Sequence, residues 1–233
     1  MELLAGTSGF SFPEWRGSFY PEDLATDRML AHYATRLPAV EINQTFYRLP
    51  KPDVLAGWRA EVPEGFRFVL KASRRITHVK RLRDVEEPLA FLFRSAEALE
   101  EALGAVLFQL PPNAQQNLER LETFLQAVPT GARCAFEFRH RSWNTPETHA
   151  LLEARDCAWV VTDHDVVGDD PLPRTASWGY LRLREESYDD AALRAWRTRL
   201  EHCGVERAYA FFKHEDGAAG ARHAARLLEL AGR

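Results

Sequence analysis

Two glutamates near the ends of short apolar runs are the side chains of this sequence best suited to acid–base chemistry. Glu41 lies in AVEIN and Glu137 lies in CAFEF, each between apolar neighbours. Paired carboxylates suit general acid and base catalysis, and in glycoside hydrolysis the distance between them sets the outcome. Asp163 ends a third run, AWVVTD. We therefore predict Glu41 and Glu137 as acid and base, with Asp163 as a catalytic residue that orients them.

Basic side chains occur at comparable positions. One strand-like run ends at Lys71 and leads into the basic stretch KASRRITHVKRLR. Arginine binds phosphate or carboxylate groups through paired hydrogen bonds, and lysine binds them as a point charge. The expected anion clamp consists of Lys71, Arg74, Arg139, Arg182 and Lys213. Two alternatives remain: the basic stretch is a solvated loop, or Glu137 with Arg139 or Arg182 forms a salt-bridge network that only holds the scaffold together.

Further ligand contacts are expected from polar and aromatic side chains near the same run ends. The polar ones are Thr7, Asn43 and Gln109. Tyr47 and Trp143, together with Trp15, are candidate stacking faces for a sugar or base whose phosphate the cations would hold. The alternative for these aromatics is a packed cap under long loops.

Four histidines raise the alternative of a metal site. His78, His140, His164 and His214 follow different runs, and with the carboxylates they would make a mixed site that activates water. Because no HxH or HExxH spacing supports it, we do not favour a divalent metal, and the cofactor stays unknown. A GxSxG motif is absent, and the three cysteines show no metal-ligand spacing.

These side chains are carried by a regular alternation of strand-like and helix-like segments. Eight short apolar runs are predicted strands, at residues 3–7, 39–43, 67–71, 105–110, 134–138, 158–163, 180–184 and 208–213. Between them lie segments of helical period, at 22–37, 53–60, 88–103, 117–128, 146–155, 189–203 and 218–232. Gly104, Gly204 and Gly232 are predicted to end three of these helices. The connection at 164–177 has no helical pattern, so its helix is expected to be weak or missing.

Strict alternation of this kind predicts parallel strands joined by right-handed crossovers. Eight units in one chain, with no GxGxxG or GxxxxGK[ST] motif, favour a closed TIM-type (β/α)8 barrel in a single domain, 1–233, over an open nucleotide-binding sheet. Alternate strand residues should then face the helices, and these are apolar: Val40, Ile42, Phe68, Leu70, Val106, Phe108, Leu110, Phe136, Phe138, Leu181, Leu183, Ala210 and Phe212. The polar residues between them are predicted to line the mouth of the barrel, where such barrels do chemistry.

Composition narrows the class of partner. The 233 residues are 45% hydrophobic and 27% charged, as in ordinary globular proteins, and a net charge of -4 argues against non-specific binding of polyanions by the whole surface. With no signal peptide or membrane-length apolar run, we expect a cytoplasmic protein without membrane association. No apolar dimer stripe is visible, so a monomer is the default expectation.

The sequence resembles the YecE-like proteins, catalogued as domain of unknown function 72. The resemblance runs along nearly the whole chain, through GTSGFSFPEWRGSFYP, VEINQTFYRLP, FRFVLKASRRITH, LFQLPP, FEFRHRSW, YLRLR and AYAFFKHEDGAAGARHA. It implies a TIM-type barrel and no established reaction. Two departures from the family pattern stand out: Arg184 and Glu185 replace a usual His and Gly, and Lys213 and His214 replace a usual pair of asparagines. If these positions contact a ligand, this chain binds something more anionic or differs in activity.

Taken together, the residues favour an enzyme, a hydrolase or isomerase, that acts on an anionic, phosphate-bearing ligand at the barrel mouth. A phosphorylated sugar and a nucleic-acid end both fit such a site. The alternative is a non-catalytic protein that binds nucleic acid or a phosphorylated metabolite.

Overall fold

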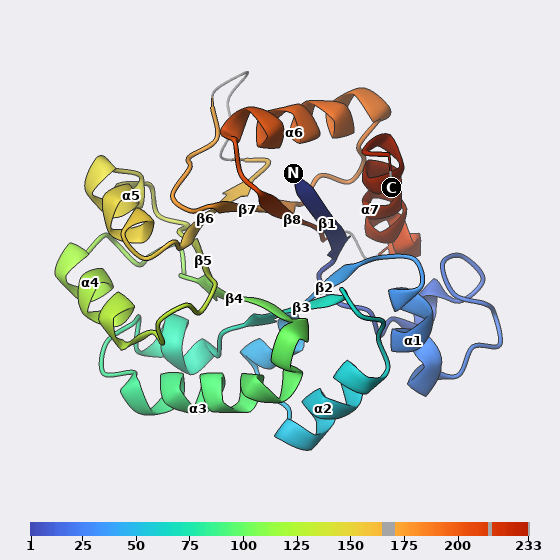
Figure 1. The fold of residues 1–233 in the computed structure, drawn as a ribbon, viewed down its shortest axis with the longest axis horizontal. Coiled ribbons are helices and arrows are strands. Elements are labelled where there is room, and N and C mark those ends of the chain that lie inside the picture. Colours follow the sequence, from blue (N-terminus) through green and yellow to red (C-terminus); the bar gives the residue numbers. More distant parts are fainter. Residues whose placement is uncertain (165–170, 214–215, 233) are drawn as a thin grey trace.

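The protein is described from a computed structural model, which covers residues 1–164, 171–213 and 216–232. Eight parallel strands form a closed barrel in chain order, with β1 paired to β8 (Figure 1). The strands are β1 (Glu2–Thr7), β2 (Ala39–Ile42), β3 (Arg67–Lys71), β4 (Leu103–Gln109), β5 (Cys134–Glu137), β6 (Ala158–Thr162), β7 (Trp178–Leu183) and β8 (Arg207–Phe212). The predicted TIM-type (β/α)8 architecture is confirmed.

Helices surround the barrel on its outside (Figure 1). In the described residues these are α1 (Met29–Ala34), α2 (Pro52–Ala60), α3 (Glu86–Ala96), α4 (Leu118–Ala127), α5 (Pro146–Glu153), α6 (Asp190–Cys203) and α7 (Ala219–Leu230). The connection from β6 to β7 has no helix at residues 163–164 or 171–177, which agrees with the prediction there. Residues 165–170 of that connection lie outside the described residues.

Local sequence signals explain where most helices begin and end. Asn117, Thr145 and Asp189 each accept a hydrogen bond from a backbone N–H one turn further on, at the starts of α4, α5 and α6. Gly204 ends α6 with a φ of 69°, as predicted, because glycine adopts this left-handed conformation without strain.

Gly104 does not end a helix, and that prediction was wrong. The residue lies inside β4, beside a shift in the register between β3 and β4. A Cβ atom at this position would lie 2.8 Å from the Tyr209 hydroxyl oxygen and 3.1 Å from the Arg67 Cβ. The glycine is needed because a side chain inside the barrel approaches its backbone closely.

Two apolar layers form the core. The predicted helix-facing residues, from Val40 and Ile42 on β2 to Ala210 and Phe212 on β8, all belong to the layer between strands and helices. The alternate residues fill the barrel itself, including Leu4, Val69, Leu107, Tyr180 and Phe211. Polar residues with the same inward orientation lie nearer the C-terminal ends of the strands. They therefore point into the mouth of the barrel. No helix in the described part of the chain is both long and apolar enough to cross a bilayer.

Candidate functional site

Arg182 occupies the centre of the barrel mouth and joins three strands. From β7 it donates two hydrogen bonds to Glu41 on β2, Nε to Oε2 at 2.9 Å and Nη2 to Oε1 at 2.7 Å. Its Nη1 donates to Oε2 of Glu137 on β5 at 2.6 Å. All three side chains are almost completely buried, with at most 3% of the side chain exposed. The structure thus brings together three residues that the sequence analysis assigned to the mouth.

Both glutamates have their acceptor positions filled. Besides Arg182, Glu41 accepts from the Ser8 hydroxyl at 2.8 Å and from the Tyr180 hydroxyl at 2.6 Å. Glu137 accepts from Gln109 Nε2 at 2.7 Å, from Arg139 Nε at 3.1 Å and from Arg184 Nη2. Each carboxylate thus receives four hydrogen bonds, which is the full capacity of an ionised carboxyl group.

This saturation argues against the predicted roles of Glu41 and Glu137 as acid and base. Burial alone raises the pKa of both carboxyl groups, but the charge of Arg182 and the donated hydrogen bonds outweigh it. The pKa of each therefore lies below its ordinary value of 4.5, and both groups stay ionised with no lone pair free for a substrate proton. Their role in this structure is to hold Arg182 and its neighbours in place.

Asp163 is not the orienter of those two carboxylates. Its Oδ2 accepts hydrogen bonds from the backbone N–H groups of Arg184 and Glu185 and from the Tyr188 hydroxyl. It makes no described hydrogen bond to Glu41 or Glu137. Because it fixes the chain directly after β7, Asp163 positions Arg184, whose guanidinium contacts Glu137.

Two lysines at the mouth have no acidic partner among the described residues. Lys71 is half-buried at the end of β3, with its Nζ 4.5 Å from the centre of the Phe46 ring, and Lys213 is exposed after β8. Neither ammonium group makes a hydrogen bond or an ion pair that involves the described residues. Burial, followed by the charge of Arg182, lowers the pKa of Lys71 to about 8. The pKa of Lys213 is lowered by the same causes, burial first and then Arg182, Arg184 and Arg139.

Positive charge is therefore in excess at the mouth. Among the described residues, five cationic side chains lie here, Lys71, Arg139, Arg182, Arg184 and Lys213, against the buried carboxylates of Glu41, Glu137 and Asp163 and the exposed carboxylate of Glu185. The repulsion extends to His78, whose pKa is lowered by burial and then by Lys71, Arg139, Arg74 and Arg81. Cations that repel one another in a partly buried site are stabilised when an anion binds between them. The mouth is therefore a candidate anion-binding site.

Two predicted ligand residues lie elsewhere. Thr7 faces outward: its hydroxyl donates to the Gly9 carbonyl and lies 2.9 Å from the Tyr33 hydroxyl on α1. Trp143 is 2% exposed, stacks on Phe138 with ring centres 4.5 Å apart, and donates to the Ala114 carbonyl at 2.7 Å. Neither side chain is available to a ligand at the mouth, so the structure argues against both predictions. Trp15 is likewise fully buried.

The other predicted contacts lie at or near the mouth. The side chain of Gln109 donates a hydrogen bond to Glu137. Asn43 donates to the Ser8 carbonyl, and its buried Oδ1 has no hydrogen-bond partner among the described residues. Tyr47 is 80% exposed beyond β2, and Arg74 is exposed beyond β3.

Ser8 and Tyr180 are the members of the network that sequence reasoning missed. Both donate to Glu41. Tyr180 lies two residues before Arg182 on the same strand, so the inward alternation that identified Arg182 contained the signal for it. Ser8 gave no such signal, because it lies just beyond β1.

The predicted histidines do not gather around the carboxylates. His78 packs edge-on against Phe46, His140 accepts from the Ser142 backbone, and His164 lies 3.8 Å from Asp163. His214 is outside the described residues. No group of three or more His, Cys, Asp or Glu side chains within the described ranges is placed to hold a metal ion.

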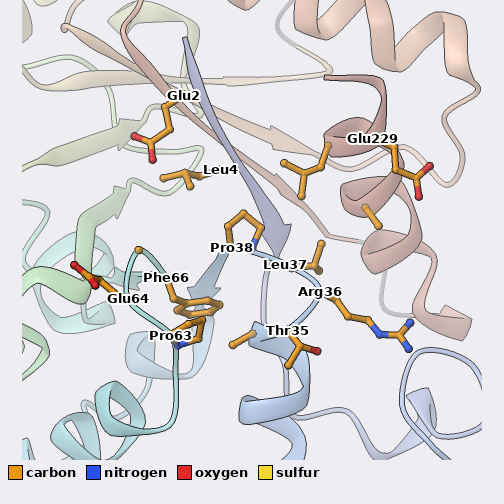
Figure 2. A pocket seen from close by; sticks show the side chains of 14 residues that line it. Glu2, Leu4, Thr35, Arg36, Leu37, Pro38, Pro63, Glu64, Phe66 and Glu229 are labelled. Atoms are coloured by element: carbon orange, nitrogen blue, oxygen red, sulfur yellow. The ribbon is translucent and has the colours of Figure 1, made fainter. Parts of the chain in front are cut away.

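A separate hollow of about 520 Å³ lies at the opposite, N-terminal end of the barrel. Figure 2 shows Leu4, Pro38 and Phe66 between the charged side chains of Glu2, Glu64, Arg36 and Glu229. None of the predicted site residues lines it. In (β/α) barrels this end serves stability rather than chemistry, so the mouth remains the candidate site.

Comparison with known sequences identifies relatives along the whole chain. A family model described as "Protein of unknown function DUF72" matches residues 4–233. The chain is 28% identical to UPF0759 protein YunF of Bacillus subtilis over 169 residues, 67% of this chain and 60% of YunF. It is 32% identical to UPF0759 protein YecE of Escherichia coli K12 over 112 residues, 48% of this chain and 41% of YecE. The matched segments thus span less than two thirds of either relative.

Solved structures show the same fold. A DUF72 family protein from Thermotoga maritima superimposes with a TM-score of 0.85 at 26% identity, with both chains covered completely. A DUF72 family protein from Enterococcus faecalis gives a TM-score of 0.82 at 18% identity, covering 99% of this chain and 96% of that one.

Proposed function

The chain belongs to the DUF72 family of proteins of unknown function, and we propose that it is an enzyme whose barrel mouth binds a small phosphate-bearing anion. The observation that carries this proposal is the excess of cations around a saturated pair of carboxylates. Glu41 and Glu137 have no acceptor position left for Lys71 or Lys213, and the pKa of both lysines is lowered in spite of the carboxylate charge nearby.

The arginines suit a phosphate group in particular. Arg139 and Arg184 each contact Glu137 through one nitrogen, and the planar guanidinium leaves further N–H donors for a second acceptor. Arg182 holds its position through three hydrogen bonds to carboxylates, so the charge nearest the bottom of the mouth is fixed before a ligand arrives. We propose hydrolysis or isomerisation of a phosphorylated sugar, or action on a nucleic-acid end, as the reaction, because each of these substrates carries the phosphate group that the cations would hold.

Thermal unfolding with candidate ligands tests the proposal. The panel contains inorganic phosphate, phosphosugars, nucleotides and short oligonucleotides, because these share phosphate and differ in the group attached to it. A ligand at 100 times its dissociation constant should stabilise the folded state by roughly 2.7 kcal/mol. Lys213→Ala should weaken that binding about tenfold, the loss of one hydrogen bond to a charged group. Lys51→Ala, which removes an exposed lysine elsewhere, is the control.

Failure of every phosphate compound to stabilise the protein, or equal effects of the two lysine variants, would contradict the proposal. Salt separates a small ligand from a nucleic-acid partner. Affinity for a polyanion should fall linearly in log salt with a slope set by the number of phosphates contacted, whereas a single phosphate group gives a shallow slope.

A further inference from the structure

Lys71 differs from the other lysines of the chain in its surroundings. The sequence contains four: Lys51, Lys71, Lys80 and Lys213. Lys51 and Lys213 are exposed, and Lys80 donates to the Asp84 backbone carbonyl. Lys71 alone is partly buried without a hydrogen-bond acceptor that the described residues supply, and its Nζ lies over an aromatic ring.

The nearby carboxylates favour its charged form, but burial and the charge of Arg182 outweigh them. Lys71 makes no described ion pair with Glu41 or Glu137, whose oxygens are taken by the arginines, Ser8, Tyr180 and Gln109. The described charged groups that change the pKa of Lys71 are Arg182, Glu41, Glu137 and Arg139. The charge of Lys71 in turn lowers the pKa of His78. Burial, Arg182 and Arg139 lower the pKa of Lys71 and Glu41 and Glu137 raise it, with a net value of about 8, so that on the order of a tenth of the amine is uncharged at pH 7.

A desolvated lysine beside other cations is the arrangement that activates an amine as a nucleophile. We propose that Lys71 forms an imine with the carbonyl carbon of an aldehyde or ketone that also carries a phosphate group. The inference rests on the proposed function, because Arg139, Arg184 and Lys213 would hold the phosphate group of the ligand while its carbonyl group meets Lys71.

The reaction is balanced without an oxidant or a reductant. The lone pair of the uncharged Nζ attacks the carbonyl carbon, and the carbonyl oxygen takes up a proton as the C=O π bond breaks. Nitrogen loses its protons, the hydroxyl group leaves as water, and a C=N bond remains between Lys71 and the ligand. One carbonyl compound and one amine thus give one imine and one water.

Pyridoxal 5′-phosphate is a suitable probe, because it carries both an aldehyde and a phosphate. The intact protein is incubated with it, the imine is reduced with borohydride, and peptide mass spectrometry measures the labelling rate at each lysine. Lys71 should be labelled at least tenfold faster than Lys51 and Lys80. Pyridoxal, which lacks the phosphate, should label Lys71 more slowly, and inorganic phosphate should protect it. The rate at Lys71 should fall in Lys213→Ala, which removes one cation of the phosphate site, and persist in Lys51→Ala, which removes an exposed lysine elsewhere.

Equal labelling of Lys51, Lys71 and Lys80 would overturn the inference. If phosphate compounds still shift the thermal transition in that case, the anion site stands without the nucleophile. Equal rates at Lys71 with pyridoxal and with its phosphate would instead support a reactive amine and count against the phosphate clamp. Lys71→Arg, which retains the charge, checks that the labelled peptide is assigned correctly and that the protein folds without the amine.

Discussion

Arg182 is the residue on which the interior of the barrel mouth most depends. It neutralises two buried carboxylates, so replacing it leaves both without their main partner. Arg182→Met should lower the free energy of unfolding at pH 7 by about 3–5 kcal/mol, the usual effect of removing one member of a buried ion pair. Urea denaturation measures the difference, and Arg83→Met, an exposed change in a loop, is the control.

The sign of the pH dependence gives this prediction a second test. In the wild type the pKa of Glu41 and Glu137 is lowered, so their stabilisation is present above about pH 4.5 and is lost as the pH falls further. Without Arg182 the buried carboxyl group of Glu41 keeps only the Ser8 and Tyr180 hydroxyl groups as partners, so burial raises its folded pKa and the variant gains stability as the pH falls, whereas Glu137 keeps Arg139 and Arg184. The loss of unfolding free energy caused by Arg182→Met should therefore be smaller at pH 5 than at pH 7. A constant deficit would show that Arg182 acts through packing rather than through charge.

At the scale of residues, the alternation of inward and outward side chains along a strand explains which positions at the mouth could be predicted from the sequence. Glu41, Glu137 and Arg182 were placed correctly because apolar residues flank them and define the other face. Thr7 was misplaced because Leu3, Leu4 and Ala5 before it are all apolar, so the sequence did not distinguish the two faces of β1. Trp143 was misjudged because the carbonyl that satisfies its indole comes from Ala114, 29 residues earlier in the chain.

At the scale of elements, close packing inside the barrel sets a strict limit at Gly104. Gly104→Ala should destabilise the protein by about 1–3 kcal/mol, because its Cβ would meet the Tyr209 ring and hydroxyl and the Arg67 side chain. Gly57 in α2 is a matched control, since a Cβ there meets nothing within 4 Å. Gly57→Ala should stabilise the protein by roughly 0.5–1 kcal/mol. Thermal unfolding of the two variants measures both effects, and changes of equal sign would contradict the packing argument.

Element positions were predictable where apolar periodicity was clear and less so where tertiary contacts replace local ones. The strands agree with the expected runs to within two residues at either end. The helix expected from residue 22 is regular only from Met29 to Ala34. The carbonyl of Leu24, which would take part in a longer helix, instead accepts from Arg16 Nε at 2.8 Å.

At the scale of the whole molecule, the exposed large apolar side chains come from separate segments. Met1, Tyr47, Val54, Val79 and Phe91 are the described examples. The sequence shows no apolar dimer stripe, and on that ground we propose that the protein is a monomer. Light scattering should give a mass near 26.6 kDa at micromolar concentration, and twice that value would show that an interface exists.

The pairing of β1 with β8 has a consequence for synthesis on the ribosome. Glu2 and Arg207, which pair across these strands, are 205 residues apart in sequence. The barrel therefore cannot close until β8 has been made, and until then β1 and the strand most recently completed each present an unpaired edge. Arrest of translation before residue 207 should leave a product that aggregates, whereas arrest after β8 has emerged from the ribosomal tunnel should leave one that folds.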